Sequence, residues 1–133
     1  MNFHLQLANA MGNKVTAIST SPHKKEAALK IGAERFIVSS DPDSLAAGAD
    51  SLDLILNTVS ADHEMSAYLP LLRRNGALVQ LGLVTKKHSC SQITLMRKRI
   101  KVFLYVSRFT YSWEKITTKI FKLELGRISS VPE

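Results

Sequence analysis

Residues 14–38 read KVTAISTSPHKKEAALKIGAERFIV, and this stretch predicts a strand, a helix and a second strand in succession. KVTAIS at 14–19 and RFIV at 35–38 have the apolar, β-branched character of strands. Between them, a serine and a proline at 21–22 supply an N-cap and a first-turn proline for a helix that ends before Gly32. The side chains expected to face inward from this helix are Ala27, Ala28 and Ile31. The stretch therefore predicts a β-α-β unit with parallel strands.

The following segments repeat this alternation of short apolar runs and helix-like stretches. A short helical stretch opens at 41–42, and LDLILNTV at 52–59 is a nearly continuous apolar run, typical of a strand buried on both faces. Residues 62–72 are compatible with a helix that its proline would end or bend. An Asn-Gly turn at 75–76 then leads into the strand ALVQLG at 77–82. Four such strands predict an α/β fold, a parallel sheet with helices on both faces.

The composition indicates one domain in a reducing compartment. The 133 residues, 45% of them apolar, allow one core and little more, so we assign 1–133 to a single domain. Cys90 is the only cysteine, which excludes an internal disulfide, a four-cysteine zinc site and a CxxC redox pair. No apolar run reaches the roughly 18 residues needed to span a bilayer. We therefore expect a cytoplasmic protein with no membrane partner.

Positive charge is concentrated near the C-terminal end. The net charge is +7, but residues 1–85 carry seven Lys/Arg against eight Asp/Glu, whereas residues 86–133 carry eleven against three. The densest run is Arg97, Lys98, Arg99 and Lys101. Such a run can contact nucleic acid. No RNA-binding aromatic motif or zinc finger accompanies it, so a solvated basic face is the favoured interpretation and nucleic acid an unlikely partner.

The sequence predicts no metal site. The histidines are widely spaced and form neither HxH nor HExxH, so we expect four surface side chains, at His4, His23, His63 and His88. For the lone Cys90 we expect a buried or half-buried thiol without a chemical role.

An anion site is predicted where the first strand runs into the following helix. Ser19, Thr20 and Ser21 supply hydroxyl donors, and Lys24 adds a positive charge near free backbone N–H groups. An acidic residue at this strand end would bind the ribose 2′-hydroxyl of NAD, and none is present. The pattern favours NADP over NAD. The alternative is that Ser21 only caps the helix and Lys24 is merely solvated.

The sequence from residue 5 to about residue 100 resembles the cofactor domain of zinc-dependent medium-chain alcohol dehydrogenases, in their cinnamyl-alcohol-dehydrogenase-like, NADP-dependent branch. The stretches that carry the resemblance are QLANAMGNKVTAISTSPHKKEAALKIGAE at 6–34, VSSDPD at 38–43, DLILNTVSADHEMSAYLPLLRRNGALVQLGL at 53–83 and the less specific ITLMRKR at 93–99. The resemblance implies a Rossmann-like fold and an NADP cofactor whose 2′-phosphate is held by the serine/threonine cluster and Lys24.

Further cofactor contacts follow from the same resemblance. Beside the nicotinamide and its ribose it implies Thr58 and Val59, then Leu81, Gly82 and Leu83. Asn57 stands where the family commonly has Asp, a departure that need not affect binding.

Other departures are larger. The family's glycine-rich GxGxxG-type loop should precede the helix near residues 6–10, and the sequence shows no such loop there. The resemblance therefore implies a parallel sheet incomplete at its N-terminal edge, with an apolar patch exposed where the missing strand and catalytic domain would pack. The family's catalytic zinc has no ligands in this chain. Beyond residue 100 the sequence diverges, either because a different element replaces the family's helix or because splicing, frameshift or truncation substituted a foreign end.

Three functions remain open on the sequence. The first is an NADP-binding fragment of an alcohol/aldehyde oxidoreductase that is not catalytic alone. The second is a non-catalytic interaction protein, a homodimer through the sheet edge. The third, the least favoured, is a basic nucleic-acid-binding module.

Overall fold

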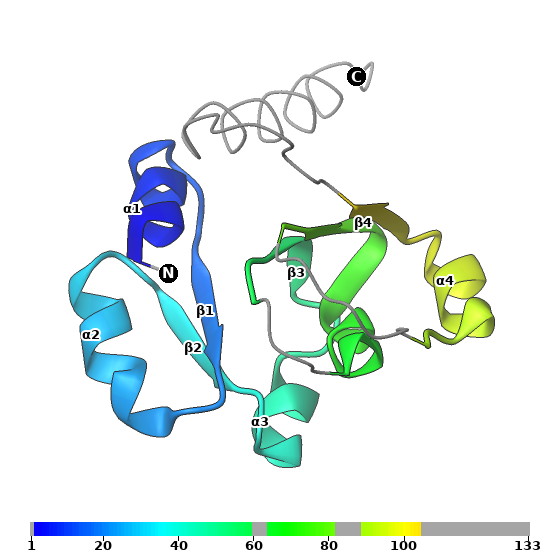
Figure 1. The fold of residues 1–133 in the computed structure, drawn as a ribbon, viewed down its shortest axis with the longest axis horizontal. Helices are drawn as coiled ribbons and strands as arrows, with labels where there is room; N and C mark the ends of the chain where they lie inside the picture. Colours follow the sequence, from blue (N-terminus) through cyan, green and yellow to red (C-terminus); the bar gives the residue numbers. More distant parts are fainter. Residues whose placement is uncertain (1, 60–63, 82–88, 105–133) are drawn as a thin grey trace.

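A computed structural model describes residues 2–59, 64–81 and 89–104 of the 133-residue chain (Figure 1). Short helices alternate with strands throughout these ranges. The α-helices are α1 (Asn2–Ala10), α2 (Lys25–Lys30), α3 (Pro42–Ala47) and α4 (Gln92–Lys98), and the 3-10 turns are η1 (Pro22–Lys24), η2 (Met65–Ala67) and η3 (Leu69–Leu71). The strands are β1 (Thr16–Ser19), β2 (Arg35–Val38), β3 (Leu52–Asn57), β4 (Leu72–Gln80) and β5 (Lys101–Leu104).

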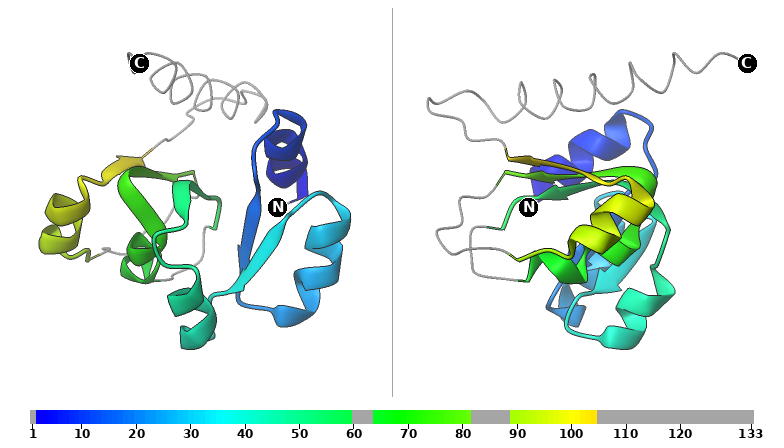
Figure 2. Two further views of the ribbon diagram at one scale, coloured as in Figure 1. Left: turned by 180° about the vertical axis from the view of Figure 1, so that it is seen from behind. Right: turned by 90° about the vertical axis from the view of Figure 1, so that its right-hand side faces the viewer.

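All described strand pairs are parallel, which confirms the predicted α/β class. The strands nevertheless form two sheets, β1-β2 and β3-β4-β5, and no ladder joins these two described sheets. Figures 1 and 2 show β1 on the side of its sheet nearer β3. The interruption therefore lies between β1 and β3, inside the row of strands.

The first sheet has a different partner on each face. On one face, Ala17 and Phe36 pack with Leu5 of α1 and Ala28 of α2. Side chains alternate along a strand, so Ile18 and Ile37 lie on the other face, where they pack into the core of the second sheet. Side-chain packing thus connects two sheets that share no hydrogen-bonded ladder.

The main core lies beside the second sheet. Its fully buried side chains are Leu69, Leu71, Leu72 and Leu78. Gly48, after α3, allows close approach to this core, since a Cβ there would lie 2.7 Å from Ile37 Cδ1. A side chain at Gly48 would therefore have to displace the end of the Ile37 side chain.

The helix between β1 and β2 departs from its predicted form. The chain makes the 3-10 turn η1 over the proline, and α2 begins only at Lys25. Ala28 is buried and Ile31 half-buried, as expected, but Ala27 is exposed, so its predicted inward position is wrong. The 3-10 turn changes the rotation per residue and so shifts the face that the helix presents.

The predicted helix at 62–72 is also wrong over its described part. Two 3-10 turns occupy this part, and β4 already begins at Leu72. The proline in η3 lacks the N–H that a continuing α-helix would need. The predicted Asn-Gly turn is present inside β4 as a bulge, with Asn75 at φ 66° and a register shift opposite Leu52–Leu54.

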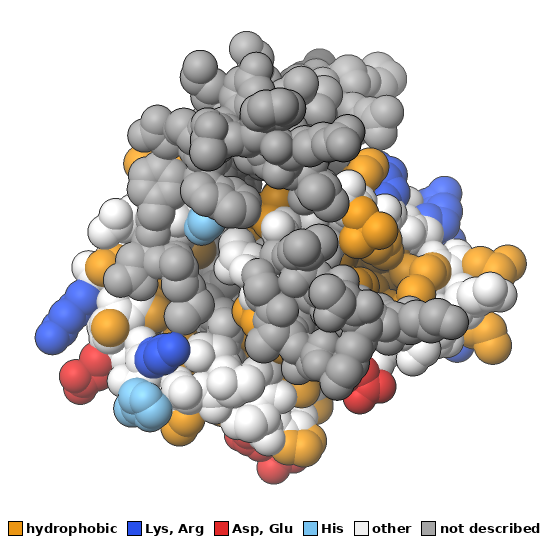
Figure 3. Space-filling model, viewed as in Figure 1, with side chains coloured by type: hydrophobic (Ala, Val, Ile, Leu, Met, Phe, Trp, Pro, Cys, Tyr) orange, Lys and Arg blue, Asp and Glu red, His pale blue; other side chains and the backbone are white. Residues whose placement is uncertain are grey.

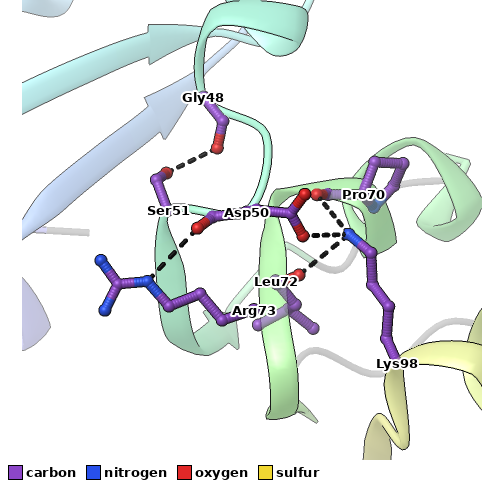
Figure 4. Close-up of polar contacts among 7 residues, drawn as sticks. All are labelled: Gly48, Asp50, Ser51, Pro70, Leu72, Arg73 and Lys98. Carbon is purple, nitrogen blue, oxygen red and sulfur yellow. Dashed lines mark hydrogen bonds and ion pairs between the residues drawn. The ribbon is translucent and has the colours of Figure 1, made fainter.

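Lys98 of the basic run is part of the internal structure. Its Nζ donates to Asp50 Oδ1 at 2.6 Å and to the carbonyl oxygens of Pro70 and Leu72 at 2.9 and 3.1 Å (Figure 4). These bonds connect α4 to the residues at the amino-terminal ends of β3 and β4. Lys98 is therefore not available to a nucleic acid, although Arg97 and Arg99 are exposed.

Two expectations about single side chains are corrected. Cys90 is exposed, not buried or half-buried. His4 is half-buried, and burial lowers the pKa of its imidazole, with a further lowering by the charge of the N-terminus. His23 is exposed as expected, whereas His63 and His88 lie outside the described residues. Among the described helices, none is long and apolar enough to cross a membrane.

Candidate functional site

The predicted anion-binding residues lie together at the carboxyl end of β1. The Ser21 N–H donates to Ser19 Oγ at 3.3 Å, which curls the chain around the strand end. Although Ser21 stands at the N-cap of η1, its side chain makes no capping hydrogen bond. The alternative that Ser21 only caps the helix is therefore wrong. The hydroxyl of Ser21 has no role in the helix start.

Lys24 lies one turn further along. Its backbone N–H donates to Ser21 O at 3.2 Å, and its side chain is exposed. The residue closes η1 and stands at the N-cap of α2, whereas the sequence predicted it within the first turn of a continuous α-helix. The short turn brings the lysine and the serine cluster onto one surface segment, so an ammonium group accompanies the hydroxyls.

The end of β2 adjoins this cluster and contributes Ser39 and Ser40, which were not among the predicted site residues. The Ser39 N–H donates to Ser19 O at 2.9 Å, and Ser40 Oγ donates to Thr20 O at 3.0 Å. The available signal was a pair of hydroxyl residues where each strand ends, Ser19-Thr20 at β1 and Ser39-Ser40 directly after β2. Parallel neighbours end at the same sheet edge, so these two pairs meet.

Of the carboxylates near this segment, Glu26 is exposed in the first turn of α2, whereas Asp41 has a structural role. Asp41, which follows β2, accepts a hydrogen bond from Asp43 N at 3.1 Å and caps α3. The segment 19–24 contains no acidic side chain. An anion at the end of β1 would thus meet hydroxyls and an ammonium group from that segment, with no carboxylate of its own to repel it.

The second predicted group follows β3 and β4. Thr58 is half-buried and Val59 exposed directly after β3, and Leu81 follows β4. The Leu81 side chain is buried with Val79 against Leu54 and Leu56, and its N–H donates to Asn57 O at 2.8 Å. The other two predicted contacts, Gly82 and Leu83, lie outside the described residues. The structure brings Thr58, Val59 and Leu81 to the ends of two paired strands.

No metal centre is formed by the described part of the chain. No group of three His, Cys, Asp or Glu side chains in it is placed to hold a metal ion. The zinc expected for the full-length family therefore has no ligand set among these residues.

Parallel strands with helices on both faces define this chain as a Rossmann-like α/β domain. A family model described as zinc-binding dehydrogenase matches residues 2–122. The probable formaldehyde dehydrogenase AdhA of Bacillus subtilis (strain 168) is 44% identical over 95 residues, which is 71% of this chain and 27% of that protein. NADP-dependent alcohol dehydrogenase C 1 of Mycolicibacterium smegmatis is 51% identical over 79 residues, or 59% of this chain and 23% of that protein.

A solved structure agrees with these relatives. Cinnamyl alcohol dehydrogenase of Sorghum bicolor matches with a TM-score of 0.75 and 34% identity, covering 77% of this chain and 30% of that one. The chain belongs to the zinc-binding dehydrogenase family, so the resemblance identified in its sequence is confirmed. It spans about a quarter of the length of the curated relatives named above.

Proposed function

We propose that this chain provides the NADP(H)-binding part of a zinc-type alcohol dehydrogenase, an alcohol/aldehyde oxidoreductase, and is not catalytic alone. The observation that carries the proposal is the end of β1, where Ser19, Thr20 and Ser21 lie beside an exposed Lys24 in a segment without a carboxylate. A 2′-phosphate needs hydroxyl or N–H donors and a positive charge. The relative from Mycolicibacterium smegmatis is named NADP-dependent, which supports this assignment.

The remaining contacts of the cofactor are proposed at the ends of β3 and β4. Thr58 and Val59, with Leu81, Gly82 and Leu83, would lie beside the nicotinamide and its ribose. Half-buried Thr58 offers a hydroxyl and exposed Val59 an apolar surface, both directly after β3. Ligands of open α/β sheets bind outside the carboxyl ends of the strands, which is where Thr58, Val59 and Leu81 stand.

Substitution of Lys24 tests the 2′-phosphate site. We expect NADPH to bind the purified chain more tightly than NADH does, and Lys24→Ala to weaken NADPH binding by about tenfold, the loss of one charge-assisted contact. NADH affinity should be nearly unchanged, because NADH lacks the 2′-phosphate. The measurement is calorimetric titration of both cofactors.

Lys25→Ala is the matched control, since Lys25 is also exposed and adjacent in sequence. It should leave the preference for NADPH intact. Folded protein that gives no heat with either cofactor would contradict the proposal. Equal losses for Lys24→Ala and Lys25→Ala would indicate general charge attraction, not a site.

A homodimer through the outer strand is the second proposed function, favoured by one observation. All four residues of β5 are exposed, and they include the apolar Val102, Phe103 and Leu104. Figure 3 shows apolar side chains gathered on the side of the molecule where β5 and α4 lie. β5 pairs only with β4 among the described strands, so its other edge can pair with a second copy.

Leu104→Glu tests the dimer. If β5 pairs with its counterpart, a charge at this 75% exposed position should raise the dimer dissociation constant about tenfold or more. Sedimentation over a concentration series measures that constant. Met96→Glu, at an equally exposed apolar position on α4, should have a smaller effect. A wild-type chain that stays monomeric at all concentrations would overturn this second proposal.

A further inference from the structure

Both backbone groups of Val59 are bound by side chains from two neighbouring strands. Asn57 Oδ1 of β3 accepts a hydrogen bond from the Val59 N–H at 3.2 Å. Gln80 Nε2 of β4 donates to the Val59 carbonyl oxygen at 3.4 Å. Val59 lies beyond the end of β3, where no strand ladder holds its backbone. The two amide side chains replace that ladder.

The two amides are placed for this by the sheet itself. Asn57 and Gln80 are register partners at the ends of β3 and β4, and they are the two buried polar side chains found among the described residues, 7% and 4% exposed. Burying a polar amide is unfavourable unless it is hydrogen-bonded. The bonds with Val59 meet part of this requirement for each amide.

The Val59 side chain remains 46% exposed, although its backbone is held from both sides. An exposed valine directly after a strand would ordinarily be free to move with its loop. Here its backbone is fixed, so the apolar side chain is presented in one position at the carboxyl end of the sheet. A fixed apolar surface suits a flat ring, because no side-chain or loop ordering is needed on binding.

We infer that Asn57 and Gln80 are positioning residues that hold the Val59 side chain as an apolar contact surface for the nicotinamide half of the cofactor. The inference depends on the proposed NADP(H) function. It assigns to two buried side chains, neither of them a cofactor contact, control over affinity for one half of the ligand. The other half, the 2′-phosphate, is left to Ser19, Thr20, Ser21 and Lys24.

Paired substitutions and two ligands test this inference. Asn57→Leu removes the acceptor for Val59 N–H, whereas Asn57→Asp retains an acceptor oxygen. Gln80→Met removes the donor and keeps the side-chain length. Each variant is titrated with NADPH and with adenosine 2′,5′-bisphosphate, which carries the phosphate but no nicotinamide. We call the two hydrogen bonds from Asn57 and Gln80 to the Val59 backbone the clamp. Amide hydrogen exchange at Val59 tests the clamp directly, without any cofactor.

We expect Asn57→Leu and Gln80→Met to weaken NADPH binding about five- to tenfold, as the loss of one hydrogen bond implies. Both should leave adenosine 2′,5′-bisphosphate affinity unchanged, and Asn57→Leu should accelerate exchange at Val59. Asn57→Asp should bind NADPH like the wild type. A variant that merely unfolds would lose both ligands together.

Three outcomes would overturn the inference. Unchanged NADPH affinity in folded Asn57→Leu and Gln80→Met would show that the clamp does not position the cofactor, while the proposed function would stand. Fast exchange at Val59 in the wild type would show that no clamp exists. Wild-type protein that binds neither ligand would overturn the proposed function itself, and with it the clamp's role in binding.

Discussion

Lys98→Met is expected to lower the free energy of unfolding by about 2 kcal/mol, because it removes the donor that two backbone carbonyls and a carboxylate share. Lys98 Nζ bonds Asp50 and the carbonyls of Pro70 and Leu72 (Figure 4). The lysine side chain is 25% exposed and that of Asp50 66% exposed, so solvent screens the ion pair. We attribute most of the effect to the lost carbonyl bonds, although Pro70 O also accepts a hydrogen bond from Asp50 N at 3.0 Å. Urea unfolding measures it.

Two further variants separate the contributions to this anchor. Arg97→Met removes an exposed charge from the same helix and should change the stability by less than about 0.5 kcal/mol. Asp50→Asn removes the ion pair but leaves the carbonyl bonds, so its effect should fall between the other two. If Lys98→Met were no worse than Arg97→Met, the anchor would have no energetic role.

The fold was predictable where local pattern and burial agree. LDLILN at 52–57 became strand β3, although only Ile55 and Asn57 of it are buried, and RFIV at 35–38 became β2, since β-branched and apolar residues fit a parallel sheet. The helix expected at 62–72 failed because its proline and the early start of β4 favoured 3-10 turns. The separation of β1 from β3 depends on which strands pair, which pattern alone does not specify.

The candidate site was predictable only in part, for the same reason. The cluster at 19–21 and Lys24 are close in sequence, so their proximity follows from one turn. Asn57 and Gln80 meet only because β3 and β4 pair in a register that includes the bulge at Asn75. The extra residues of that bulge determine which β4 side chain stands opposite Asn57. No local signal in the sequence predicts this pairing.

Ile37→Ala should weaken the packing between the two sheets, so that the first sheet opens at a lower free energy than the second. Ile37 belongs to β2 of the first sheet, yet it is 2% exposed within the core of the second. Truncation of a buried isoleucine costs about 2–4 kcal/mol, from lost burial and a cavity. No described ladder joins the sheets, so this loss weakens their main connection.

Ile55→Ala is the matched control, because Ile55 is a similarly buried isoleucine of the same core but lies in β3 of the second sheet. Native-state amide exchange distinguishes the two variants. In Ile37→Ala, the amides of β2 should lose protection while those of Leu78 and Val79 in β4 largely keep theirs. In Ile55→Ala, protection should fall in β4 as well. If Ile37→Ala lowered protection equally in both sheets, the domain would unfold as one unit. The packing at Ile37 would then not be a connection whose loss lets the two sheets open separately.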